Sequence, residues 1–228
     1  MRRRGLLLAL VLSLTGACRF GFDAMDRDAA SGDARDGATD AAPGSPDAAV
    51  TTAWQMVRIG SALGCGIRAN DQSLWCWGAQ QSVAILPTDE RTVAEQTQIG
   101  SAAWASVSLS AIDLASELFD GHVCGLQSDN SLWCWGGNRS GELGPREGNP
   151  GRDPGQIAGV WNEVAVSSGF YGFSCAIDST DQLYCWGSNR NGQLGSTTAP
   201  GGPAPEPVAG AVWKQIRTGE EFACGIQT

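Results

Sequence analysis

The sequence predicts an all-β protein built from repeated antiparallel sheets, and three observations lead to this prediction. Two cysteines about ten residues apart recur along the chain, and the second is followed by Trp-Gly. Polar residues that favour turns separate two short apolar runs inside each copy. A Trp-x-x-Val/Ile segment precedes each copy, and a unit that returns about every fifty residues indicates a repeat architecture. The cysteines are Cys65 and Cys76, Cys124 and Cys134, Cys175 and Cys185, and Cys224, which begins a fourth copy.

The first element is a leader, residues 1–18. Three arginines near its start carry positive charge, and the apolar run Leu6–Leu14 is too short to span a bilayer. The five residues that end at Cys18 resemble the bacterial lipobox, although Thr15 stands where that motif usually has leucine. The resemblance implies that the Cys18 sulfur is lipidated and anchors the chain to a membrane. The alternatives are an ordinary secretory signal cleaved near Ala17 and an uncleaved anchor.

Residues 19–50 are predicted to form a disordered linker that lifts the repeats off the membrane. The segment consists mostly of Ala, Asp, Gly, Ser and Pro, and its seven aspartates repel one another. These carboxylates form no regular calcium loop. Without the leader, the chain has 12 basic against 24 acidic residues. This balance argues against nonspecific nucleic-acid binding, which needs clustered Lys and Arg.

Residues 122–136 show how one copy is expected to fold. The polar segment Gln127–Ser131 separates two apolar runs and favours a β-hairpin with a tight turn. A turn centred on Asp129 places Cys124 opposite Cys134. Strand alternation then puts the cysteines on one face and the tryptophans on the other. Both faces are apolar, so neighbouring propeller blades or solenoid layers must cover them.

Each hairpin is expected to carry its own disulfide. Directly opposed residues in an antiparallel pair lie at a separation that suits a disulfide, and the leader implies an oxidising compartment. Zinc ligation is the alternative, but zinc sites prefer closer cysteine spacing and histidine partners, which are missing here. We therefore expect no metal. The expected disulfides are Cys65–Cys76, Cys124–Cys134 and Cys175–Cys185, with Cys224 unpaired.

The full unit resembles the repeat of the RCC1 (regulator of chromosome condensation 1) family. The motif reads Cys-Gly-Leu, then Leu-Trp-Cys-Trp-Gly-x-Asn-x-x-Gly-x-Leu-Gly, with Trp-x-x-Val/Ile ahead of it. The likeness covers residues 54–228, about three and a third units, and the cysteine-stapled version resembles bacterial secreted members. It implies four-stranded blades of about fifty residues, commonly seven, in a β-propeller. Residues 51–228 would then form a partial propeller, about half of seven blades, truncated in the fourth unit.

The cysteine count points the same way. Lipidation of Cys18 leaves three pairs and Cys224, whose partner would fall about ten residues later. We expect the chain to be the N-terminal part of a longer propeller or a truncated reading frame. Assembly of several copies into a ring and an open array are the alternatives.

The predicted function is non-catalytic binding, with no catalytic residue and no cofactor. The single histidine, His122, is expected to be structural, and the sequence holds no nucleophile elbow, histidine cluster or phosphate loop. The expected partners are an unknown protein or glycan and, through the lipid anchor, a membrane. The expected location is the bacterial cell envelope, at the outer membrane, its periplasmic face or the cell surface. Segments Ser106–Phe119 and Gln80–Gln96 interrupt the repeat and are the candidate binding loops.

The family resemblance also implies two other functions. Some secreted bacterial relatives inhibit β-lactamases, and eukaryotic relatives act as guanine-nucleotide exchange factors. An exported, lipidated protein would not meet the GTPase partner of an exchange factor.

Overall fold

The computed structural model describes the repeat region in several stretches: residues 53–60, 62–79, 92–110, 121–145, 151, 153–169, 171–196, 200–210 and 212–228. The predicted leader and linker, residues 1–18 and 19–50, lie outside the described residues. Within these stretches, no helix is long and apolar enough to cross a membrane.

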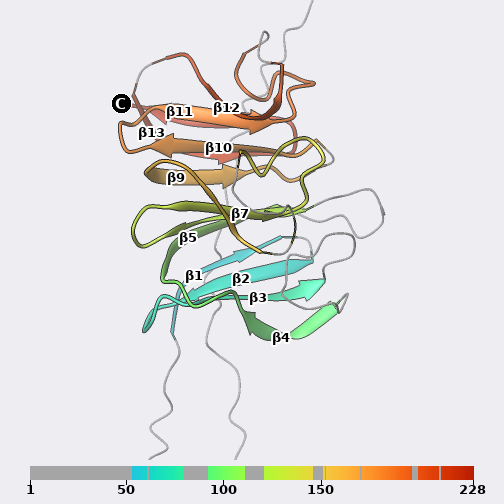
Figure 1. Cartoon of the computed structure of the whole chain (residues 1–228), viewed down its shortest axis with the longest axis vertical. Coiled ribbons are helices and arrows are strands. Elements are labelled where there is room, and N and C mark those ends of the chain that lie inside the picture. Colours follow the sequence, from blue (N-terminus) through green and yellow to red (C-terminus); the bar gives the residue numbers. More distant parts are fainter. Residues whose placement is uncertain are drawn as a thin grey trace, which may run out of the picture. The chain divides into compact units, whose positions relative to one another are not determined.

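The described strands form four antiparallel sheets, here called blades 1 to 4, that follow one another along the chain (Figure 1). In each blade, strands adjacent in the sequence pair with each other. This architecture confirms the all-β prediction. Blade 1 contains β1 (Trp54–Ile59), β2 (Leu63–Arg68), β3 (Leu74–Ala79) and β4 (Thr92–Gln98). Blade 2 contains β5 (Trp104–Leu109), β6 (His122–Gln127), β7 (Leu132–Gly136) and β8 (Gly155–Ile157). Blade 3 contains β9 (Trp161–Val166), β10 (Phe173–Asp178), β11 (Leu183–Gly187) and β12 (Gly202–Pro207), and blade 4 contains β13 (Trp213–Thr218) and β14 (Ala223–Gln227).

The hairpins have the register that the sequence predicts. In blade 2, Cys124 lies opposite Cys134 and Leu126 lies opposite Leu132. The same register recurs in blades 1 and 3, and the extra residue of blade 1 is taken up in its turn. Three disulfides join the expected partners, Cys65–Cys76, Cys124–Cys134 and Cys175–Cys185.

A side-chain network explains why the hairpin turns are tight. In blade 2, Asp129 Oδ1 accepts hydrogen bonds from the Ser131 backbone N–H at 2.9 Å and from its hydroxyl at 2.6 Å. The Ser131 hydroxyl oxygen in turn accepts the Trp133 indole N–H at 2.8 Å. Asp71 and Ser73 repeat the arrangement in blade 1. These bonds hold the pKa values of both aspartates below their usual range, because the serines donate to the charged carboxylate.

The glycine after each Cys-Trp pair meets a backbone requirement. Gly187 has φ of +104°, and Gly78 has φ of +116°. A Cβ at Gly187 would lie 2.6 Å from the Gly172 carbonyl oxygen. A side chain at this position would be strained and would also push the two hairpin strands apart.

Each of blades 1 to 3 has a fourth strand, as the family resemblance implies, but the residues alone did not locate these strands, which are β4, β8 and β12. β4 overlaps the segment Gln80–Gln96 that was expected to be a loop. In β12, prolines occupy three of six positions, a composition that argues against a central strand. An outer strand tolerates them because only one of its edges must pair. The pairing of β12 with β11 is accordingly interrupted between Cys185 and Gly187.

Buried tryptophans fill the interfaces between adjacent blades. Trp135 of blade 2 is fully buried in a cluster with the cysteine face of blade 1. Trp186 of blade 3 is fully buried against the cysteine face of blade 2. Both apolar faces of a hairpin are thus covered by neighbouring blades, as the sequence predicts.

Removing one disulfide is expected to lower stability measurably. The Cys175→Ala/Cys185→Ala variant should lose roughly 2–3 kcal/mol of unfolding free energy, because the bond closes a loop of sequence separation 10 and restrains the unfolded chain. Urea denaturation followed by tryptophan fluorescence measures the change. Cys224→Ala, at an exposed free cysteine, is the matched control and should change stability by less than about 0.5 kcal/mol. Equal losses in the two variants would contradict a stabilising role for the bond.

Candidate functional site

The first strands of successive blades lie beside one another and form the inner surface of the repeat array. β1 contacts β5, β5 contacts β9, and β9 contacts β13. Side chains bridge these strands across blade boundaries. Ser108 Oγ accepts the Val166 N–H at 3.1 Å, and the Thr218 hydroxyl donates to the Val166 carbonyl at 2.7 Å. Glu163 accepts the Ile216 N–H at 2.9 Å and forms an ion pair with Arg217.

A groove of about 490 Å³ runs along these strands, and we call it the inner-strand groove. Its lining mixes hydroxyl, charged and apolar side chains from all four blades, which gives it the varied chemistry of a recognition surface. The lining includes Met56, Arg58, Ile59, Ser106, Ser108, Glu163, Ala165, Arg217 and Thr218.

Comparison of the four inner strands separates scaffold positions from variable ones. The first position is always tryptophan, and the fourth is always valine or isoleucine. In blades 2 to 4 that fourth residue is buried. The fifth position varies: it is arginine in blades 1 and 4, serine in blade 2 and alanine in blade 3. All four of these residues line the groove. These fifth-position residues are Arg58, Ser108, Ala165 and Arg217.

The charges in the groove are not all neutralised internally. Arg217 pairs with Glu163, whereas Arg58 donates to the Val57 carbonyl at 3.2 Å and contacts no carboxylate of the described residues. Beside it, Ile59 is 80% exposed. An unpaired cation next to an exposed aliphatic side chain suits a partner that presents a carboxylate beside an apolar group.

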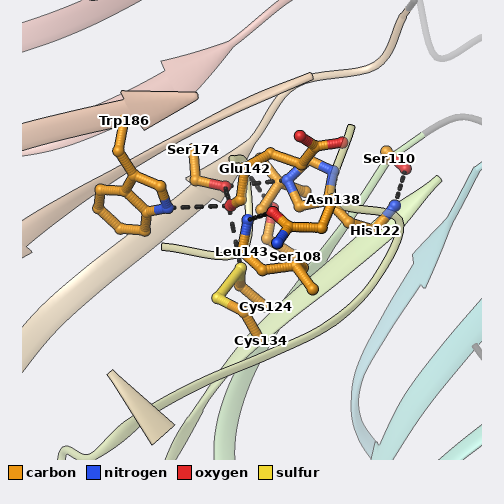
Figure 2. Close-up of a disulfide and its surroundings, with 11 residues drawn as sticks. Ser108, Ser110, His122, Cys124, Cys134, Asn138, Glu142, Leu143, Ser174 and Trp186 are labelled. Atoms are coloured by element: carbon orange, nitrogen blue, oxygen red, sulfur yellow. Dashed lines mark hydrogen bonds between the residues drawn. A yellow bond between two sulfur atoms is a disulfide. The ribbon is translucent and has the colours of Figure 1, made fainter. Parts of the chain in front are cut away.

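A second polar cluster lies between blades 2 and 3, but it is sealed from solvent (Figure 2). His122 Nε2 lies 2.9 Å from Ser174 Oγ, and the Ser174 hydroxyl donates to the Glu142 carbonyl at 2.8 Å. The same carbonyl accepts the Trp186 indole N–H at 2.9 Å. Because the Ser174 proton is engaged, His122 Nε2 must carry the hydrogen that joins the pair.

This arrangement makes the His122–Ser174 pair structural. Burial lowers the pKa of His122 to about 3, so the imidazole is neutral at physiological pH. A nucleophilic serine needs an acceptor nitrogen as its base, and here that nitrogen is a donor. His122 therefore has the structural role that the sequence predicts. Within the part of the chain that the structure describes, no three His, Cys, Asp or Glu side chains gather to hold a metal ion.

The other predicted site residues have these places. Cys18 lies outside the described residues. The six disulfide cysteines are buried. Cys224 is a free, exposed cysteine on β14, opposite Arg217 of β13.

The candidate binding loops require a correction. Ser106–Leu109 belongs to β5 and Thr92–Gln96 to β4, so these parts are strands within a blade. Residues 80–91 and 111–119 of the two segments are outside the described residues, and Ser110 directly follows β5. The sequence analysis missed the inner-strand groove, although the variable fifth position of the Trp-x-x-Val/Ile strands was a usable signal.

Comparisons with known proteins agree with the repeat assignment. Residues 164–193 match the family model for the regulator of chromosome condensation (RCC1) repeat. Human protein RCC2 is 30% identical over 106 residues, which is 45% of this chain and 20% of RCC2.

Solved structures with the same fold include Prp20p from Saccharomyces cerevisiae and human WBSCR16. Prp20p is 17% identical with a TM-score of 0.60, and the match covers 77% of this chain and 44% of Prp20p. For WBSCR16 the identity is 16% and the TM-score 0.59, with coverage of 73% and 42%. The chain thus spans less than half the length of these relatives. Its blades, its recurring Cys…Cys-Trp-Gly unit and these matches together show that the chain carries repeats of the RCC1 type.

Proposed function

We propose that this chain is a non-catalytic binding module, lipid-tethered at Cys18 to the bacterial cell envelope, that holds a protein or glycan in the inner-strand groove. The main support for the proposal is that different positions of the inner strands have different roles. The repeated Trp and Val/Ile positions contribute mainly to packing, although Val107 and Val164 also reach the groove, whereas the fifth position presents polar or charged side chains to the groove in three of the four blades. The exception is Ala165, which is 5% exposed. Residues released from packing are free to determine what is bound.

The chemistry of the groove favours an anionic feature on the partner. Arg58 offers several donors in a fixed plane, which suits a carboxylate. Ser106 and Thr218 add hydroxyl groups, and Ile59 adds an exposed apolar contact. An acidic side chain beside an aliphatic one, or a carboxylated sugar, would use all of these groups.

The predicted leader and linker support a location at the cell envelope. A short apolar leader that ends in a lipobox-like cysteine, followed by an acidic, apolar-poor linker, is typical of a protein held at a membrane by lipid. In an expressing bacterium, globomycin should cause the unprocessed precursor to accumulate. Cys18→Ser should abolish incorporation of labelled palmitate. Normal processing under globomycin would overturn the lipid anchor.

The binding proposal is tested with the full chain against purified envelope proteins and cell-wall glycans. We expect a saturable ligand whose dissociation constant rises at least about tenfold in Arg58→Glu, because a repelling charge replaces the donor. Lys214→Glu is the matched control, since Lys214 is exposed on β13 but does not line the groove. If both variants weakened ligand binding equally, the inner-strand groove would not be the binding site. Turnover of a bound glycan would refute the non-catalytic role.

A further inference from the structure

A pocket of about 290 Å³ lies where the loop after β7 in blade 2 meets blade 3, and we call it the arginine pocket. Blade 2 contributes Arg139 and Ser140, and blade 3 contributes residues 187–190 and 200–202. None of its described lining residues carries a carboxylate, although the whole chain has a net charge of -9. The pocket therefore gathers positive charge on an acidic protein. It shares no described lining residue with the inner-strand groove, so it goes beyond the proposed function.

The two arginines of the pocket follow asparagines that fix the loops carrying them. In blade 2, Asn138 Oδ1 accepts the Leu143 N–H at 3.0 Å, and Asn189 forms the equivalent bond in blade 3. Arg139 and Arg190 are the next residues along the chain. The backbone that carries each guanidinium is therefore already held in place, and a ligand has to order only the side chains.

Packing between the two blades brings these arginines to one pocket. The loop of blade 2 lies so close to the start of β12 that a Cβ at Gly141 would be 2.6 Å from the Pro203 nitrogen. In blade 3, the guanidinium carbon of Arg190 lies 4.8 Å from the centre of the Tyr171 ring, a contact that orients the cation. Two guanidinium groups thus line the same pocket from different blades.

The hydroxyl of Ser188 is an independent sign of a ligand. Ser188 lines the pocket and is 6% exposed, and its Oγ is buried without a hydrogen-bond partner among the described residues. A buried hydroxyl without a partner costs free energy that a bound acceptor would recover. The repeat does not need this hydroxyl for packing, because the equivalent residue is Gly137 in blade 2 and Ala79 in blade 1.

A phosphate group matches these side chains better than a carboxylate does. A phosphate monoester carries about two negative charges near neutral pH and has three strong acceptor oxygens. It can therefore engage two guanidinium groups, each of which binds oxygens in a planar fork, and still accept a hydroxyl proton. A carboxylate has a single charge and two oxygens, which one arginine already satisfies.

We propose that the arginine pocket binds a phosphate group, either as the free anion or as the phosphoryl group of a phosphorylated sugar. Arg139 and Arg190 bind its oxygens from the two blades, and the Ser188 hydroxyl donates to one of them. Because the bound phosphate joins blade 2 to blade 3, it also stabilises the folded chain.

Titration of the full chain with inorganic phosphate and with glucose 1-phosphate, followed by phosphorus-31 NMR at constant ionic strength, tests the proposal. We expect saturable binding, with a dissociation constant at least about tenfold higher in both Arg139→Gln and Arg190→Gln, because each loses a charged hydrogen-bond donor. Lys214→Gln is the matched control, since Lys214 is an exposed cation that does not line the pocket. It should change the constant by less than about twofold.

Ser188→Ala separates phosphate binding from folding. It removes no hydrogen bond made among the described residues, so the ligand-free variant should unfold at the same temperature or a higher one. Its dissociation constant for phosphate should nevertheless rise about threefold to tenfold, because one donor is lost.

Competition with glucuronate, a sugar carboxylate, tests the class of ligand. At equal concentration, glucuronate should displace less than about a tenth of the bound phosphate. Tighter binding of glucose 1-phosphate than of inorganic phosphate would assign the pocket to sugar phosphates, and equal binding would assign it to the free anion. Unchanged phosphate binding in the two arginine variants, or displacement by glucuronate as effective as by phosphate itself, would overturn the proposal.

Discussion

Replacement of Trp186 by alanine is expected to lower the free energy of unfolding by about 3–5 kcal/mol. The indole is fully buried between blades 2 and 3, where its loss leaves a cavity that packed β-strands close only in part. The Glu142 carbonyl also loses the donor that lies 2.9 Å away. Urea denaturation followed by circular dichroism measures the loss, because that signal does not depend on the removed fluorophore.

Trp133 provides the matched control for this substitution. It lies in the hairpin of blade 2, it is only partly buried, and its N–H binds Ser131 within the same hairpin. Trp133→Ala should therefore cost about 1–2 kcal/mol. If the two alanine substitutions lower the free energy of unfolding equally, the indole after the second cysteine does not contribute more to packing between the blades than Trp133 does.

The second large effect is acid destabilisation through His122. Its pKa is about 3 in the folded chain against 6.5 for the unperturbed side chain, because burial disfavours the charged imidazole. Between these pH values the unfolded chain binds a proton that the folded chain does not. Stability should be unaffected above pH 6.5 and should fall by about 1.4 kcal/mol for each pH unit below it, down to pH 3.

A His122→Gln variant isolates this effect from other acid groups. Glutamine keeps a side-chain donor for Ser174 but does not titrate. The difference in unfolding free energy between the two proteins should shrink steadily as the pH falls from 6.5 to 4. The turn aspartates Asp71 and Asp129 destabilise both proteins alike at lower pH, because their lowered pKa values require them to be ionised in the fold. A difference that stays constant with pH would show that the imidazole of His122 is accessible to protons.

The hairpins could be predicted from the sequence because their determinants are local. The period-two alternation and the Asp-x-Ser turn place Cys124 and Cys134 opposite each other without knowledge of the rest of the chain. The structural role of His122 was predictable from its isolation in the sequence, but its partner Ser174 was not. The two residues are 52 positions apart, and only blade packing brings them together.

The fourth strands and the groove were not predictable in the same way. β12 contains prolines that argue against a strand, and it forms only because β11 presents an edge to pair with. The inner-strand groove combines residues from four blades, so it exists only after the blades have stacked. Ile59 is exposed and Arg58 meets no carboxylate of the described residues, but both have ordinary strand neighbours in the sequence, and nothing local marks them as a surface.

The central claim is that the repeated residues are scaffold and that partners bind at the inner-strand groove. Photo-crosslinking in the native bacterium tests it directly, with benzoylphenylalanine placed at Ile59 in the groove or at Thr180 in the exposed turn of blade 3. Both positions are exposed, so each tolerates the larger side chain. We predict an ultraviolet-dependent adduct with a protein or glycan from Ile59, competed by its purified partner, and none from Thr180. An adduct from Thr180 with none from Ile59 would contradict the claim.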